Sequence, residues 1–131
     1  MLPRRFAAND EATHTVIGTA GSAEKIALAK QYGCDHVINY KTEDFAARVK
    51  EITNGKGVPV VYDSVGKDTF MGSLDCLQPR GLMVSFGNAS GPVDAFAPGT
   101  LSTKGSLYLT RPSLWHYTSD DAEYAASAKA L

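Results

Sequence analysis

Side chains that can bind an anion follow the first two apolar runs of the sequence. Ser22 offers a hydroxyl and, at the start of a predicted helix, a backbone amide. Lys25 lies one turn later, and Tyr40 follows the second run. Helix N-termini, ammonium groups and phenols all interact favourably with phosphate. Each residue also has a simpler explanation, as a helix cap, a surface lysine and a half-buried aromatic. The residues alone leave both explanations open.

Further polar or glycine residues follow the later apolar runs. The groups are Ser64-Val65-Gly66, Phe86-Gly87-Asn88 and Thr110-Arg111. Gly66 has no side chain, so a ligand could approach the backbone there. A simple strand-to-helix turn would explain the same glycine. Similarly, Phe86 by itself indicates a core position and Arg111 an ordinary loop arginine.

The elements that must position these residues alternate along the chain. Short apolar runs predict five strands, near residues 16–17, 36–40, 58–63, 81–87 and 106–110. Cap and stop signals predict helices from Ser22 to Gly33, from Thr42 to Asn54-Gly55, from about Asp68 to Leu77, and from Ser119 or Asp120 to Leu131. A Gly/Pro-rich connection from Gly87 to Gly105 replaces a further long helix.

This alternation predicts an α/β fold. Strands that are apolar throughout require cover on both faces, and the intervening helices supply it. The result is a Rossmann-like, doubly wound parallel sheet with right-handed crossovers. Such sheets bind ligands at the carboxyl ends of their strands, where the polar groups above are found.

The composition narrows the classes of function. The 131-residue chain has a formal net charge of -1 and scattered Lys and Arg residues, which argues against a nucleic-acid partner. Neither a membrane span nor a signal peptide is evident, so we expect a cytoplasmic protein. The two cysteines and three histidines show no metal-binding spacing, and we expect neither a metal site nor a disulfide.

Four motifs resemble one enzyme family. "VINY", "VYDSVG", "SLDCLQPRGLMVSFGNASG" and "GSLYLTRPSL" occur in order. They are similar to the cofactor domain of zeta-crystallin-type NADPH:quinone oxidoreductases, in the medium-chain dehydrogenase/reductase superfamily. The resemblance covers about Val16 to Leu131. It implies hydride transfer from NADPH to a quinone or conjugated carbonyl, in a zinc-independent branch of the superfamily.

The resemblance also implies roles for individual residues. It assigns Lys25 and Tyr40 to the 2′-phosphate of NADPH. No Asp or Glu follows the first strand, where a carboxylate would bind the ribose hydroxyls and repel that phosphate. The implied cofactor-binding residues are Gly21, Ser22, Lys25, Tyr40, Ser64, Val65, Gly66 and Asn88. Those implied to lie near the nicotinamide and substrate are Phe86, Gly87 and Arg111. No catalytic acid or nucleophile can be named.

Residues 1–15 do not fit the family pattern. They contain no glycine and therefore cannot supply the Gly-rich phosphate loop that should precede Val16. We interpret them as an atypical leader and residues 16–131 as a partial NADP-binding domain that lacks its first strand. Alone, such a chain is expected to bind NADPH weakly and to reduce little quinone.

Two other functions remain open. The chain could be a non-enzymatic dinucleotide-binding or dimerisation fragment, because family members pair the edge strand that corresponds to Gly105–Arg111 across a two-fold axis. A methyltransferase would share the doubly wound fold, but the quinone-reductase motifs argue against it. The natural electron acceptor is undetermined.

Overall fold

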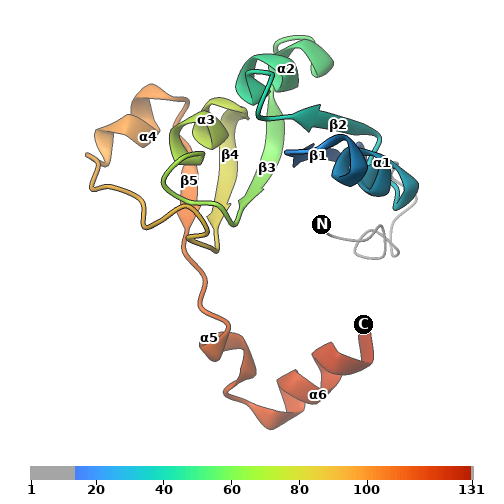
Figure 1. The fold of residues 1–131 in the computed structure, drawn as a ribbon. Helices are drawn as coiled ribbons and strands as arrows, with labels where there is room; N and C mark the ends of the chain where they lie inside the picture. The colour runs from blue at the N-terminus through green and yellow to red at the C-terminus, as the bar shows by residue number, and fades with distance from the viewer. Residues whose placement is uncertain (1–13, 131) are drawn as a thin grey trace. The chain divides into compact units, whose positions relative to one another are not determined.

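The computed structural model describes residues 14–130. The chain divides into two compact units, one extending through Lys56 and the other beginning at Gly57. Each unit contains its own parallel sheet, of two and three strands (Figure 1). The predicted α/β class with parallel strands is confirmed, although the described strands form two sheets instead of one.

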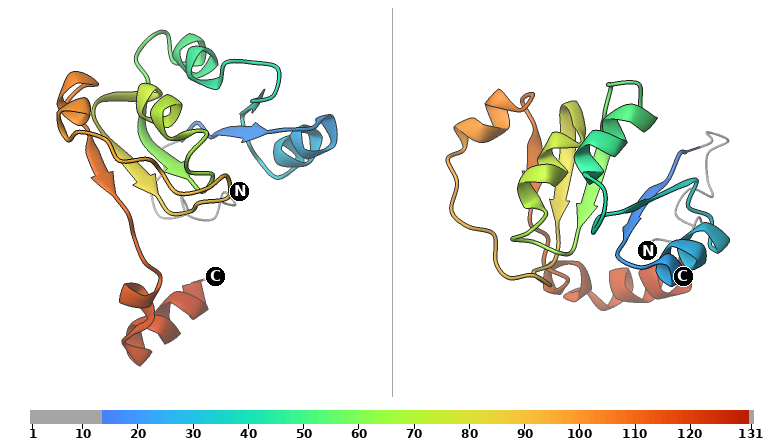
Figure 2. Two further views of the ribbon diagram at one scale, coloured as in Figure 1. Left: turned by 60° about the vertical axis from the view of Figure 1, so that its left-hand side comes forward. Right: turned by 45° about the horizontal axis from the view of Figure 1, so that its top comes forward.

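The first unit is a strand, helix, strand and helix. β1 (Ile17–Ala20) and β2 (His36–Asn39) run parallel, with Ile17 opposite His36 and Ala20 opposite Asn39. α1 (Ala23–Gln31) connects them, and α2 (Phe45–Ile52) follows β2 (Figure 2). This connection brings the carboxyl ends of β1 and β2 to the same edge.

The two helices of this unit begin at different kinds of cap. Ser22 caps α1 as predicted, because its Oγ accepts a hydrogen bond from Lys25 N at 3.3 Å. The predicted cap of α2, Thr42, is wrong. The carbonyl of Asn39 accepts from the amides of Thr42 and Glu43, so these residues form a turn. The helix therefore starts after Asp44, whose Oδ1 accepts from two backbone amides.

The second unit holds three parallel strands in the order β3-β4-β5. Their bounds are Val58–Asp63, Leu77–Ser85 and Tyr108–Thr110. α3 (Phe70–Asp75) joins β3 to β4, and the short α4 (Gly99–Thr103) precedes β5. α5 (Trp115–Thr118) and α6 (Asp121–Ala130) follow; they contact each other and contain no buried residue.

β4 starts earlier than the sequence predicts. The strand is expected near residues 81–87, but Leu77 already pairs with Val58 before the register shifts, and Pro79-Arg80-Gly81 form an irregularity inside the strand. Arg80 has a φ of 62° at this point, and its amide bonds the carbonyl of Gly105 at 2.8 Å. The irregularity thus links β4 to the residues that precede β5.

One face of the three-stranded sheet carries the core of the second unit. The buried residues of this core are Phe70, Leu74, Leu77, Met83 and Leu107, with Val93, Phe96 and Leu101 packed against them. The opposite face is open, with Val60, Tyr62 and Tyr108 exposed. The prediction of cover on both faces is therefore wrong for the described residues. The reason is that the connection after β4 packs on the same face as α3.

No helix within residues 14–130 has the length and apolarity needed to cross a bilayer.

Leu74 provides a test of this packing. Its side chain is 0% exposed, so Leu74→Ala should lower the free energy of unfolding by about 2–5 kcal/mol, through lost burial and a cavity. Leu114 is 77% exposed, and Leu114→Ala should cost less than about 0.5 kcal/mol. Urea unfolding of both variants measures the difference, and equal losses would contradict the described core.

Candidate functional site

Gly21 and Tyr40 meet at the carboxyl ends of β1 and β2. A Cβ placed on Gly21 would lie 2.6 Å from Tyr40 Oη and 3.1 Å from Lys41 Cε. The first distance is shorter than any normal contact of a Cβ atom. A side chain at this position would therefore displace the phenol from the end of β1. The register explains the meeting, since Tyr40 follows directly after the last residue pair of the ladder, and its amide bonds the carbonyl of Ala20 at 3.2 Å.

The start of α1 adds donors beside this contact. Ser22 Oγ uses a lone pair to cap Lys25 N, and its hydroxyl hydrogen stays available to donate. The first backbone amides of a helix have no partner within the helix and attract negative charge. Ser22 and Lys25 are both exposed, and no ion pair involves Lys25 among residues 14–130. The first unit thus presents hydroxyls, amides and an ammonium group to solvent.

In the second unit, a buried carboxylate shapes the turn after β3. Asp63 is 4% exposed. Its Oδ1 accepts from the amides of Val65 at 2.8 Å and Gly66 at 3.0 Å. Its Oδ2 accepts from the hydroxyls of Thr69 and Ser73, both at 2.7 Å. Four donors therefore converge on one side chain and fix the loop formed by residues 64–66.

These hydrogen bonds also set the acidity of the carboxyl. Burial by itself raises the pKa of Asp63, because it disfavours the charged form. The four hydrogen bonds favour the charged form, and together they outweigh burial and hold the pKa below its ordinary value. Asp63 is accordingly ionised throughout the neutral range.

The loops that follow β3 and β4 are bonded to each other. Ala89 N donates to the carbonyl of Ser64 at 3.2 Å, and Ser90 N donates to that of Val65 at 2.7 Å. Two glycines permit this closeness. A Cβ on Gly87 would lie 2.3 Å from the oxygen of Ser64, and a Cβ on Gly66, whose φ is 90°, would lie 2.6 Å from that of Gly91. The two loops therefore form one backbone platform.

A shallow hollow of about 490 Å³ opens beside this platform. Asn88 and Arg111 contribute polar groups to its lining, and Phe70, Phe96 and Leu109 contribute apolar ones. Arg111 is held in place, because its Nη1 donates to the carbonyl of Ser85 at 2.9 Å. Asp94 also lines the hollow, so it contains both a cation and an anion.

Comparisons with known proteins show the family of the chain. The family described as zinc-binding dehydrogenase matches residues 5–125. The chain belongs to this family. One relative is a quinone oxidoreductase of Salmonella typhimurium, which is 59% identical over 88% of this chain and 36% of its own length. Another is a 2-haloacrylate reductase of a Burkholderia species, which is 53% identical over 89% of this chain and 35% of its own length. The crystal structure of Escherichia coli quinone oxidoreductase complexed with NADPH has a TM-score of 0.85 and 55% identity, over 88% of this chain and 35% of its own.

The chain spans about a third of the length of those relatives. Its family consists of oxidoreductases. The name of the family mentions zinc. Within residues 14–130, however, no group of three or more His, Cys, Asp or Glu side chains is placed to hold a metal ion. Neither Cys34, which is half-buried, nor Cys76, which is buried, forms a disulfide with another described residue.

The predicted site residues fall into two groups, one in each unit. The first group is Gly21, Ser22, Lys25 and Tyr40. The second is Ser64, Val65, Gly66, Phe86, Gly87, Asn88 and Arg111. In the second group, Asn88 and Arg111 share the hollow, whereas Phe86 is not among its lining residues and its side chain is half-exposed at 50%.

Sequence reasoning missed two residues. Asp63 was assigned only to a strand, although an Asp two residues before a Val-Gly pair at a strand end is a recognisable signal for a side chain that caps a turn. Lys41 was not singled out, and nothing in its sequence neighbourhood indicates that it lies over Gly21.

The acidity of Asp63 predicts an acid-sensitive stability. Because its folded pKa lies below the unfolded value of about 3.9, its contribution is complete above that value and is lost as pH falls through the lower folded pKa. The free energy of unfolding of the wild type should therefore fall more steeply below pH 5 than that of Asp63→Asn, which cannot titrate here. Denaturant titrations from pH 7 to pH 3 measure this difference.

Asp68 gives a matched control, because it belongs to the same connection and its side chain is exposed. Asp68→Asn should keep the pH dependence of the wild type. If Asp63→Asn and the wild type respond alike to acid, the carboxylate does not stabilise the folded state through these hydrogen bonds.

Proposed function

We propose that this chain is part of the cofactor domain of an NADPH-dependent quinone oxidoreductase. The observation that carries this proposal is the close contact of Gly21 and Tyr40 beside Ser22 and Lys25. Gly21, Ser22 and Ala23, which directly follow β1, include no carboxylate, and an acidic residue there would favour a free ribose hydroxyl. The relative from Escherichia coli, crystallised with NADPH, supports the same cofactor.

The residues present fit the cofactor at its adenosine end. Ser22, Lys25 and Tyr40 would hold the 2′-phosphate, because they offer two hydroxyls and an ammonium group at the end of β1 and the start of α1, where Gly21 leaves room for the phenol of Tyr40. Along the rest of the cofactor, backbone groups of Ser64, Val65 and Gly66 would approach it closely, with Asn88 near the diphosphate or ribose.

At the other end, Phe86, Gly87 and Arg111 would lie near the nicotinamide and the substrate. NADPH, when bound, supplies the hydride, and a quinone or another conjugated carbonyl accepts it. The protein groups bind and orient both molecules. Arg111 would polarise the carbonyl oxygen of the acceptor, since the bond of its Nη1 to Ser85 aims the guanidinium at the hollow and leaves other N–H donors available. A cytoplasmic location stays a prediction.

Lys25 tests the cofactor assignment. Lys25→Ala should weaken NADPH binding by about 1.5 to 3 kcal/mol, the range for a lost hydrogen bond to a charged group, and leave NADH binding nearly unchanged. Side-by-side calorimetric titrations with the two cofactors measure the difference. Lys30, in the last turn of α1, is a matched control, and Lys30→Ala should change neither affinity. Equal losses for both cofactors in Lys25→Ala would refute the 2′-phosphate role.

We also propose that two copies associate through the edge strand Gly105–Arg111. β5 pairs with β4 on one side, and no described strand pairs with its other edge. Unpaired backbone groups at an edge favour addition of a further strand. The same edge would be the contact surface in the alternative function, in which the chain is a dinucleotide-binding or dimerisation fragment without activity of its own.

Tyr108 tests this association. Its side chain is 64% exposed on β5, so Tyr108→Lys should place like charges near each other in a dimer and shift it toward monomer. Tyr124→Lys, at a 57% exposed position on α6, should have no such effect. Light scattering over a range of concentrations reports the molar mass. A monomeric wild type, or a dimer that Tyr108→Lys leaves intact, would rule this edge out.

A further inference from the structure

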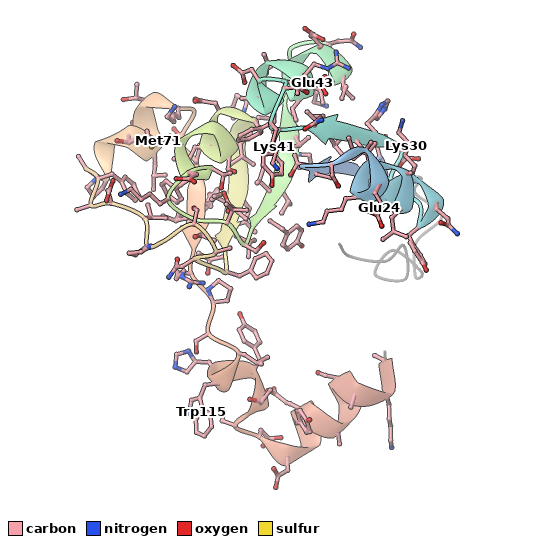
Figure 3. All side chains as sticks on the ribbon, viewed as in Figure 1. Glu24, Lys30, Lys41, Glu43, Met71 and Trp115 are labelled. Atoms are coloured by element: carbon pink, nitrogen blue, oxygen red, sulfur yellow. The ribbon has the colours of Figure 1, made fainter. Side chains whose placement is uncertain are left out.

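Lys41 lies at the same glycine as the proposed phosphate-binding residues. Its Cε, the carbon that bears the ammonium group, is 3.1 Å from the position of a Cβ on Gly21. Tyr40 Oη is 2.6 Å from that same position. The lysine chain therefore lies across the end of β1 beside the phenol, although it comes from the turn after β2 (Figure 3).

The turn that carries Lys41 is held by a side chain. Asn39 Oδ1 accepts from Lys41 N at 3.1 Å. The carbonyl of Asn39 also accepts from the amides of Thr42 and Glu43, at 3.1 and 2.9 Å. These bonds fix the backbone on both sides of Lys41, and so they set the position from which its side chain extends toward Gly21.

The nearby carboxylates do not neutralise this lysine. Glu43 uses Oε1 to accept from Asn39 N at 3.0 Å, and its Oε2 pairs with Arg48 Nε at 3.0 Å. Figure 3 shows Glu24, in the first turn of α1, apart from Lys41. Within the described part of the chain, no ion pair includes Lys41. The ammonium group is therefore available to an anion from solution.

We propose that Lys41 is a second cation for the 2′-phosphate and helps the chain to distinguish NADPH from NADH. This inference rests on the proposed function. A phosphate monoester carries a charge of about −1.5 to −2 at pH 7, which one lysine does not balance. Lys25 and Lys41 together match that charge, while Ser22 and Tyr40 supply neutral donors. A ribose hydroxyl gains nothing from a second ammonium, so Lys41 acts on specificity.

The test uses two nucleotides that differ only in the 2′-phosphate. Adenosine 2′,5′-bisphosphate and adenosine 5′-monophosphate are titrated into the chain by calorimetry. Lys41→Gln should weaken binding of the bisphosphate about tenfold, as expected for loss of a charged hydrogen bond, and change that of the monophosphate less than about twofold. Lys41→Arg keeps the charge and should keep most of the preference.

Lys30→Gln is the matched control, because Lys30 is an exposed lysine of the same unit and Figure 3 shows it away from Lys41. It should bind both nucleotides like the wild type. If Lys41→Gln also binds the bisphosphate like the wild type while Lys25→Ala binds it poorly, Lys41 has no such role and the proposed function stands.

Two other outcomes overturn the inference in different ways. If Lys41→Gln weakens both nucleotides equally, Lys41 supports the site in general and does not set specificity. If the wild-type chain itself fails to favour the bisphosphate, both this inference and the assignment of the 2′-phosphate site are wrong.

Discussion

The described part of this protein depends on backbone approaching its neighbours more closely than any side chain would permit. At Gly21, Gly66 and Gly87, an added Cβ would lie within 2.6 Å of another group. All three residues follow strands of a parallel sheet, Gly21 in the first unit and Gly66 and Gly87 in the second. Because glycine has no side chain, the loops after β3 and β4 can contact each other at Gly66 and Gly87. Contact between loops is what turns separate strand ends into a surface that a long cofactor could bind.

Asp63 stabilises that arrangement in the second unit. A buried carboxylate is costly unless donors surround it, and here two amides and two hydroxyls do so. The amides belong to the loop after β3, and the hydroxyl of Ser73 belongs to α3. One side chain therefore joins strand, loop and helix. The loop can then serve as a rigid support for the residues that follow β4.

In the proposed function, charge selects the ligand of the first unit. The end of β1 has glycine and serine where a carboxylate would favour a ribose hydroxyl, Lys41 lies beside that glycine, and Lys25 is an exposed residue of the helix that follows. Acidic residues near the turn are engaged elsewhere, since Glu43 bonds Asn39 and Arg48. An anion that approaches this edge therefore meets donors whose charge is not already balanced. This balance, more than any single residue, supports the choice of a phosphorylated cofactor.

The sequence by itself determined the local elements. The cap at Ser22, the strand Val58–Asp63 and the class of the fold could all be predicted, because each depends on residues within a few positions of one another. Predictions failed where a hydrogen bond that the local pattern does not indicate forms instead. For example, Thr42 N donates to the carbonyl of Asn39 in a turn, so that Asp44 and not Thr42 caps α2. Only the tertiary structure decided that Lys41 lies over Gly21, twenty positions earlier, and that Asp63 is buried among four donors. Such contacts depend on strand register and helix placement, which bring together residues that no local pattern relates.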